Sequence, residues 1–449
     1  MIRTKNLYVF FLTLVFTATY SQSGFNFFGN NQKAVSLQFK FINNLIVIPI
    51  EVNGQKLSFI LDSGVDKTIF FNLSEVDSLK LNRVKKITLQ GLGGGDPIDA
   101  LLSQKNTMRI HNYMSSNQDI YVILKDKFDV SGRMGITIHG IIGQRLLKNA
   151  IININYATRR IKFYNPTYFK YPNCKKCETF PLEFFRNKPY INTKVQLDTI
   201  GNTLTDVTLL IDTGGSEAIW LFENSKKEIK TPINYFNDIL GEGLSGAIYG
   251  NKSRIKRIVL GKYEIKNPTV SFLDSTSTLF ARRFKKRNGS IGGNILRRFK
   301  VWIDYPNKKI TLKKNGSFRG GFEYNMSGID VVYSGKVLIR EKEKPQFIDS
   351  YSRGDSKTNT NNILSLVSSY TYRFRPSFRV KHVSPNSPGD KAGIKEKDII
   401  LSINGTEAHE LTLQELLNKF QGGDNRKIRM KIKRRGQPMR FKFRLVKKI

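Results

Sequence analysis

Alternating apolar and polar residues recur along most of the chain, separated by short turn sequences. Residues 47–64, VIPIEVNGQKLSFILDSG, alternate on both sides of Asn53-Gly54, a pair that supplies the positive φ angles of a two-residue hairpin turn. A looser hairpin is predicted over residues 190–214, turning near residues 201–202. Helical patterns are short, as at 144–148. The pattern therefore predicts a mainly β chain.

The chain repeats itself at an offset of 150 residues. Asp62 in the stretch LDSG aligns with Asp212 in the stretch IDTG. The other matched pairs, in the same order along both copies, are Gly91 with Gly241, Gly140 with Gly289 (one residue out of step) and Tyr156 with Tyr305. Matched features in one order predict a duplicated β unit. We expect lobe 1 at residues 35–166 and lobe 2 at residues 178–315.

Each copy places an acid on a tight turn directly after an apolar run. A single Asp in such a turn commonly caps it by accepting hydrogen bonds from nearby backbone N–H groups. If the two copies pack about a two-fold axis, however, Asp62 and Asp212 meet, and like charges that close share one proton over a wide pH range. One carboxyl group can then act as a general base and the other as a general acid on a water between them.

The residues that follow each acid suit the same arrangement. Ser63 and Thr213 can donate hydroxyl hydrogen bonds across to the opposite turn, which would tie the two acids together. Gly64 and Gly214 allow a tight backbone turn and keep Cβ atoms away from a substrate. We expect these four residues to support the pair.

These motifs carry a family resemblance. The loops LDSG and IDTG, with the downstream stretches IIG at 141–143 and SIG at 290–292, resemble the active and supporting loops of the aspartic proteases. The resemblance implies two tandem pepsin- and retropepsin-like β-barrel lobes, with Asp62 and Asp212 as the catalytic pair of an aspartic endopeptidase. The serine of SIG departs from the apolar residue that the family prefers there.

Members of that family close a β-hairpin flap over the cleft, and glycine-rich runs occupy the corresponding place in both copies. The flap candidates are Gly91 and Gly93 in lobe 1 and Gly241 and Gly243 in lobe 2. Glycine suits a loop that must open for substrate and then exclude water. Ordinary glycine turns are the alternative interpretation.

The residue after each D-[ST]-G triplet predicts the pH range in which the protein is active. Pepsin-type enzymes have a hydroxyl residue there that favours the ionised carboxylate, whereas this chain has Val65 and Gly215. Without those donors the pair should hold its proton more tightly. We expect an activity optimum between mildly acidic and neutral pH.

After lobe 2 the pattern changes, and residues 378–423 resemble a PDZ domain. Within them Thr412 and Glu415 form a T-x-x-E capping box that opens a helix. The usual Gly-Asp pair of the family is Lys397-Asp398 here. We expect this domain to occupy residues 320–449, with a polar insertion at about 340–373.

The PDZ resemblance implies a partner. PDZ domains bind a peptide C-terminus by adding it as a strand, and backbone N–H groups of a loop receive the carboxylate. The residues expected to form that loop are Met326, Ser327, Gly328 and Ile329. A domain of this type that binds no peptide is the alternative.

The N-terminus predicts a secretory signal peptide over residues 1–21. Arg3 and Lys5 precede an apolar run at 7–16 that is too short to span a bilayer. An uncleaved membrane anchor is the alternative. We expect a secreted, periplasmic or cell-envelope protein, of a bacterial type by its domain combination, rather than an integral membrane protein.

The formal net charge of +38 raises the question of a nucleic-acid partner. Basic residues are spread over every segment, and the sharpest cluster, RRFKKR at 282–287, is a single patch. We interpret the charge as a generally basic solvated surface and expect no specific nucleic-acid target.

The two cysteines, Cys174 and Cys177, stand in the sequence CKKC. Outside the cytoplasm this spacing favours a local disulfide. A zinc site would need further ligands, and no histidine lies nearby. The sequence thus implies neither a metal nor an organic cofactor.

Taken together, the motifs predict an aspartic endopeptidase that acts on polypeptides and carries a PDZ domain for recruitment. One alternative is a cell-envelope scaffold that binds proteins without turnover. Another is a serine nucleophile in NGSIGG at 288–293, which would need a base such as His139. His139 lies in the equivalent loop of lobe 1, which favours a structural role.

Overall fold

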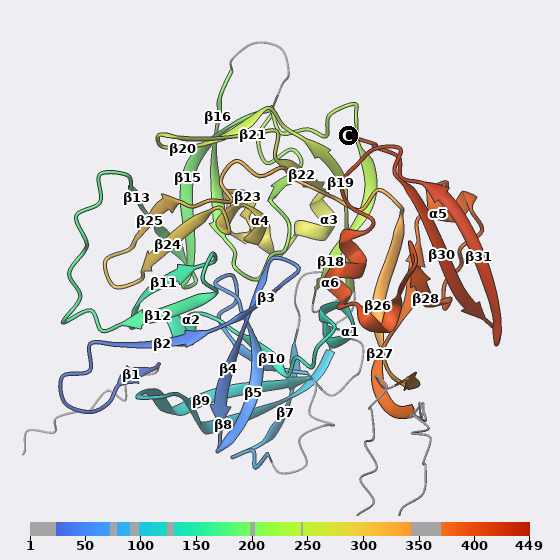
Figure 1. The fold of residues 1–449 in the computed structure, drawn as a ribbon. Helices are drawn as coiled ribbons and strands as arrows, with labels where there is room; N and C mark the ends of the chain where they lie inside the picture. The colour runs from blue at the N-terminus through green and yellow to red at the C-terminus, as the bar shows by residue number, and fades with distance from the viewer. Residues whose placement is uncertain are drawn as a thin grey trace, which may run out of the picture.

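The structure, a computed structural model, describes residues 24–71, 79–89, 98–123, 130–197, 203–243, 246–342 and 370–449. These residues form four β-sheets with a few short helices (Figure 1). The expectation of a mainly β chain is confirmed. The expected signal peptide, Gly91, Gly93 and most of the expected polar insertion lie outside the described residues.

The first sheet belongs to lobe 1, and its central strand leads to Asp62. Strand β5 (Gln55–Leu61) pairs antiparallel with β4 (Leu45–Val52) across Asn53 and Gly54, whose φ angles are 46° and 89°. On its other side β5 pairs in parallel with β10 (Gly140–Ile142). The remaining strands are β1 (Asn26–Phe27), β3 (Lys40–Ile42), β6 (Thr68–Phe70), β7 (Lys85–Leu89), β8 (Ile98–Ile110) and β9 (Tyr113–Ile123).

The second sheet repeats this arrangement in lobe 2. Strand β16 (Thr205–Ile211) pairs antiparallel with β15 (Lys188–Gln196) and in parallel with β23 (Arg287–Ile291). The expected turn near residues 201–202 lies outside the described residues, but the hairpin that it joins is present. The remaining strands are β14 (Glu183–Phe185), β17 (Ile219–Phe222), β18 (Phe236–Gly243), β19 (Gly246–Arg254), β20 (Arg257–Leu260), β21 (Tyr263–Lys266) and β22 (Thr269–Leu273).

A third, six-stranded sheet joins the two lobes. Its central strands, β11 (Ile151–Asn155) and β24 (Phe299–Asp304), come one from each copy and pair antiparallel. The outer strands are β2 (Ala34–Gln38) and β12 (Arg160–Tyr164) on one side and β13 (Glu178–Pro181) and β25 (Lys309–Lys314) on the other. The apolar residues buried by the two lobes include one continuous cluster, so a shared core accompanies the shared sheet.

Short helices follow the parallel strand of each lobe. Helix α2 (Gln144–Leu147) comes after β10, close to its predicted bounds, and α4 (Gly293–Leu296) comes after β23. The other helical segments of the lobes are α1 (Val130–Met134), α3 (Ser275–Thr278) and a 3₁₀ turn at Ala281–Arg283. Within the described ranges, no helix has the length and apolar character needed to cross a membrane.

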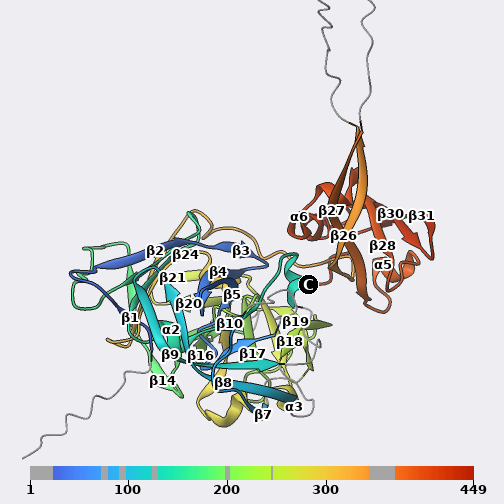
Figure 2. The ribbon, with the colours of Figure 1, turned by 90° about the horizontal axis from the view of Figure 1, so that it is seen from below.

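The C-terminal unit has its own sheet and its own apolar core. Figure 2 shows it as a separate body beside the two lobes, with the β26–β27 hairpin extending beyond it. Its strands are β26 (Ile329–Lys342), β27 (Tyr370–Val383), β28 (Ile399–Ile403), β29 (Thr406–Glu407), β30 (Lys427–Arg434) and β31 (Gln437–Arg444). Its helical segments are α5 (Pro388–Lys391), a 3₁₀ turn at Ala408–Glu410 and α6 (Leu413–Asn418).

Local motifs of this unit fold as the sequence indicates. The Thr412 side chain accepts a hydrogen bond from the Glu415 N–H, and the Glu415 carboxylate accepts one from the Thr412 N–H, which completes the expected capping box. Lys397 takes a φ of 70°, the left-handed conformation that favours glycine. Its departure from the usual Gly-Asp pair therefore places a side chain in a strained turn.

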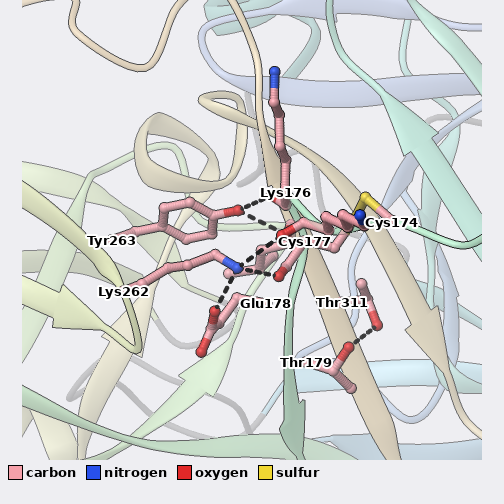
Figure 3. Close-up of a disulfide and its surroundings, with 10 residues drawn as sticks. Cys174, Lys176, Cys177, Glu178, Thr179, Lys262, Tyr263 and Thr311 are labelled. Carbon is pink, nitrogen blue, oxygen red and sulfur yellow. Dashed lines mark hydrogen bonds and ion pairs between the residues drawn. A yellow bond between two sulfur atoms is a disulfide. The ribbon is translucent and has the colours of Figure 1, made fainter.

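Cys174 and Cys177 form a disulfide in the segment that leads from lobe 1 to lobe 2 (Figure 3). Lys262 holds this segment to lobe 2, because its Nζ donates to the Cys177 carbonyl at 2.5 Å and pairs with Glu178 at 3.1 Å. The Tyr263 hydroxyl donates to a carbonyl inside the same turn. The bridge thus stiffens the chain where it passes between the two copies.

Candidate active site

Asp62 and Asp212 occupy equivalent turns at the ends of buried strands. The Asp62 N–H donates to the Ile142 carbonyl at 2.8 Å, and the Asp212 N–H donates to the Ile291 carbonyl at 2.9 Å. Each turn is therefore fastened to the parallel strand beside it. The stretches 141–143 and 290–292 hold the two acids in place, as the resemblance implies.

Reciprocal hydrogen bonds tie the two turns together. The Ser63 N–H donates to the Thr213 hydroxyl at 3.0 Å, and the Thr213 N–H donates to the Ser63 hydroxyl at 3.1 Å. The hydroxyl groups in turn donate to the carbonyls of Ile211 and Leu61, at 2.6 and 2.8 Å. Both side chains are fully or almost fully buried. Four bonds that cross between the lobes thus fix the distance between the acids.

The glycines after these residues let the acids converge. The N–H of Gly64 donates to Asp62 Oδ1 at 2.7 Å, and that of Gly214 donates to Asp212 Oδ1 at 3.0 Å. A Cβ atom on Gly214 would lie 2.2 Å from Asp62 Cγ, and one on Gly64 would lie 3.3 Å from Asp212 Oδ1. Each turn therefore packs against the acid of the other, which no larger residue at Gly214 would permit.

The two carboxyl groups are buried and close enough for each to shift the pKa of the other. Burial, followed by the neighbouring Asp212 charge, raises the pKa of Asp62 to about 7. Burial also raises the pKa of Asp212, but the positive charge of Arg287 and the Gly214 N–H act against that rise. The electrostatic environment of the two acids is therefore unequal, with the charge of Arg287 favouring the ionised form of Asp212.

Arg287 is a site residue that the sequence analysis assigned to a basic surface patch, and that assignment was wrong. Its guanidinium is buried, donates to Ser290 Oγ at 2.7 Å and lies over the rings of Tyr190 and Phe222. The aligned residue in lobe 1 is Ile138, which is fully buried. The departure at Ser290 is thereby explained, because its hydroxyl accepts from this arginine.

Lys188 is a second cation that the sequence analysis did not single out. It begins β15, is half-buried, and its charge lowers the pKa of both Asp62 and Asp212. Burial and the charge of Arg287 lower the pKa of its ammonium group, whereas the charges of Asp62 and Asp212 act against that fall. Strand pairing aligns Lys188 with Leu45, so only lobe 2 carries this charge.

Equivalent asparagines join the rim of each lobe to the active turn of the other. Asn44 Nδ2 donates to the Ser216 carbonyl at 3.0 Å, and Asn187 Nδ2 donates to Asp66 Oδ1 at 3.4 Å. Both asparagines have a positive φ in the turn before the first strand of their hairpin. The duplication therefore extends from the acids to the contacts around them.

The flap candidates of lobe 2 lie on a hairpin. Gly241 and Gly243 belong to β18, which pairs with β19 next to the tip of the hairpin. The Lys252 ammonium on β19 pairs with Asp238 on β18 at 2.8 Å and with Glu217, beside the active turn, at 3.2 Å. The hairpin is thus anchored to the segment that follows Asp212.

The loop expected to receive a peptide carboxylate uses most of its N–H groups internally. The N–H of Met326 donates to the Phe420 carbonyl at 2.9 Å. Those of Ser327 and Ile329 donate to the side chains of Asn325 and Ser327, at 2.9 and 3.0 Å. Among the described residues of this loop, only Gly328 has a backbone N–H without such a bond.

The residues of the serine-nucleophile alternative have structural partners. The hydroxyl of Ser290 accepts from Arg287, and the ring of His139 accepts from the Ser58 N–H at 3.1 Å. They belong to the supporting loops of different lobes. Among the described residues, no group of three or more His, Cys, Asp and Glu side chains is placed to hold a metal ion.

Two family models match parts of the chain. Residues 48–146 match the family model described as aspartyl protease, and residues 379–434 match the PDZ domain model. The chain thus combines an aspartyl-protease domain with a C-terminal PDZ domain. A similar solved structure is the aspartic proteinase from Irpex lacteus, at 12% identity over 64% of this chain and 99% of that chain, with a TM-score of 0.43. A search of curated proteins gave no significant match.

We expect Thr213→Val to lower the free energy of unfolding by about 2–4 kcal/mol, because it leaves the buried Ser63 N–H and Leu61 carbonyl without their partner. Thr213→Ser keeps the hydroxyl and should cost less than about 1 kcal/mol beyond the lost methyl group. Urea denaturation followed by fluorescence measures both. Equal losses in the two variants would contradict a role for the cross-lobe bonds.

The raised pKa of Asp62 makes stability depend on pH. Because the folded state binds this proton more tightly than the unfolded chain, the contribution of Asp62 to stability falls as pH rises from about 4 to about 7. Asp62→Asn cannot ionise, so we expect its melting temperature to exceed that of the parent by at least about 2 °C at pH 8. Near pH 4 the difference should be smaller, and a difference independent of pH would refute the assignment.

Proposed function

We propose that this chain is an aspartic endopeptidase in which Asp62 and Asp212 activate water for attack on a peptide bond. The observation that supports the proposal is the pair of buried carboxyl groups on equivalent turns, one from each lobe, with reciprocal hydrogen bonds joining the two turns. The aspartyl-protease match, which contains Asp62, is consistent with it.

The unequal surroundings of the acids suggest their roles. Asp212, next to Arg287, is the ionised member and accepts a proton from water as the water oxygen bonds to the peptide carbonyl carbon. Asp62 is the protonated member and donates its proton to the carbonyl oxygen. When the tetrahedral diol collapses, the C–N bond breaks, the amine nitrogen takes the proton from Asp212, and a hydroxyl proton returns to Asp62.

In this proposal the substrate is a polypeptide that lies across both lobes, and the C-terminal unit recruits or orients it. The β18–β19 hairpin with Gly241 and Gly243 covers the cleft on the side of lobe 2. The proposal also places the mature chain outside the cytoplasm, in a secreted or periplasmic location where the Cys174–Cys177 disulfide would persist.

The proposal predicts that Asp62→Asn and Asp212→Asn each lower kcat/KM on a mixed peptide library by at least about 10³-fold, because each removes a proton-transfer group. Parent activity should fall above about pH 7 as Asp62 loses its proton. Mass spectrometry of the digested library measures both. Asp66→Asn is the matched control, since Asp66 lies near the pair but transfers no proton, and it should retain most of the activity.

Two outcomes would contradict the proposal. A parent protein that cleaves nothing in the library between pH 4 and 8, yet is folded, would favour the scaffold alternative. Cleavage that survives in both asparagine variants would show that another group carries the reaction.

The substitution Lys188→Leu gives lobe 2 the leucine that lobe 1 has at the equivalent position, Leu45. Because the Lys188 charge lowers the pKa of both acids, its removal should move both limbs of the pH profile of kcat/KM to higher pH. Lys188→Arg keeps the charge and should leave the limbs in place. A profile that is unchanged by the leucine substitution would mean that Lys188 does not act on the pair.

A further inference from the structure

The PDZ domain presents a sheet edge and a helix side by side. Strand β26 ends the order of the C-terminal sheet, and within the described ranges it pairs on one side only, with β27. Helix α6 packs along β26. An edge strand beside a helix is the place where a PDZ domain takes a polypeptide segment.

That place is filled by lobe 1. The α1 segment, defined as residues 130–135, packs against β26, and Figure 1 shows α1 beside both β26 and α6. Arg133 of the segment pairs with Asp330, the second residue of β26, at 3.2 Å. Gly135, with a φ of 68°, lies so close to α6 that a Cβ atom would sit 2.9 Å from Leu413 Cβ. The segment therefore contacts both the edge strand β26 and helix α6.

A second residue of lobe 1 fastens the segment to the helix. The Asn43 N–H donates to the Gln414 side chain of α6 at 2.9 Å, and Asn43 Nδ2 donates to the Arg133 carbonyl at 2.9 Å. Met134 is buried in the apolar cluster of lobe 1, so the α1 segment is held from both sides. These hydrogen bonds join residues 371 and 90 positions apart in the sequence, so they are tertiary contacts between the two units and within lobe 1.

We propose that the groove between β26 and α6 is a polypeptide-binding site that the α1 segment occupies in cis, and that a recruited polypeptide must displace this segment. The chemistry of the contacts specifies the ligand. It is an internal segment that brings a basic side chain to Asp330 and a small residue to Leu413. Recognition of a free C-terminus is not required, since the loop at 326–329 uses most of its N–H groups internally.

Displacement of the α1 segment would affect the acids through the lobe 1 turn that contains Asn43 and Asn44. Next to Asn43, Asn44 donates to the Ser216 carbonyl in the turn that follows Asp212. The Asn44 carbonyl lies so close to α4 that a Cβ atom on Gly293 would sit 2.0 Å from it. Releasing Asn43 from Gln414 therefore loosens a contact of the active turn. This part of the inference rests on the proposed function, whereas the binding site does not.

Binding is tested with a fluorescein-labelled, C-terminally amidated peptide of residues 130–137, VSGRMGIT, and the full chain carrying Asp62→Asn and Asp212→Asn to prevent cleavage. We expect Arg133→Ala to raise the affinity for the peptide at least about fivefold, because it weakens the competitor in cis while leaving the groove intact. Arg109→Ala is the matched control, since Arg109 pairs with Glu51 at 2.9 Å elsewhere in lobe 1. Fluorescence anisotropy measures the binding.

A double variant that exchanges the charges of Arg133 and Asp330 controls for the possibility that Arg133→Ala simply unfolds. Arg133→Asp combined with Asp330→Arg restores the ion pair in reverse, so the unmodified peptide should bind more weakly than to Arg133→Ala. Equal affinities for Arg133→Ala and Arg109→Ala would overturn the proposal. A free-acid peptide that binds more than about tenfold tighter than the amide would also overturn the proposal, because the groove would then recognise a C-terminal carboxylate.

The effect of displacement on the acids is tested separately, in the chain that retains Asp62 and Asp212. Saturating peptide should change kcat/KM on a short substrate at least about twofold, and an unchanged value would refute the link through Asn43. If the chain cleaves nothing, the proposed function fails while the anisotropy result still decides the binding site.

Discussion

Four buried hydrogen bonds between the Ser63 and Thr213 turns are the constraint on which the rest of the structure depends. Two carboxyl groups in a dry environment repel each other once both ionise, and only a framework that cannot relax keeps them together. The reciprocal bonds provide that framework, and the third sheet, with β11 paired to β24, connects the two lobes above a shared apolar core. The raised pKa of Asp62 follows in part from this enforced proximity, because the neighbouring Asp212 charge contributes to it.

The two lobes share a backbone plan but differ in charge. Lobe 2 has Arg287 and Lys188 where lobe 1 has Ile138 and Leu45. A duplicated site with identical surroundings would leave the two acids equivalent, and either could hold the proton. Lys188 lowers the pKa of both acids, whereas Arg287 is the largest of the influences that lower the pKa of Asp212. Divergence between the copies thus makes the electrostatic surroundings of the two acids unequal in a nearly symmetric fold.

The C-terminal unit is joined to this machinery by more than a linker. It contacts lobe 1 through the α1 segment and lobe 2 through Tyr324, whose ring lies 5.5 Å from that of Phe236 at the base of the β18–β19 hairpin. Both contacts lead toward the residues that follow Asp212, one by Asn44 and the other by the Lys252 ion pairs. The PDZ domain therefore contacts segments of both lobes that lead to the turn after Asp212 and to the β18–β19 hairpin.

The sequence by itself determined the features that depend on neighbouring residues or on the duplication. The Asn53-Gly54 turn, the capping box of α6 and the matched turns around Asp62 and Asp212 could be predicted because local backbone preference and the repeat fix them. The burial of Arg287 could not, because a cation in a basic run looks solvated until the fold shows which strand carries it. The interlobe sheet, the internal bonding of the loop at 326–329 and the contacts of the α1 segment with β26 and α6 were likewise decided only by tertiary structure. Each depends on contacts between segments more than a hundred residues apart or on the exact packing of one loop, and no local pattern encodes such contacts.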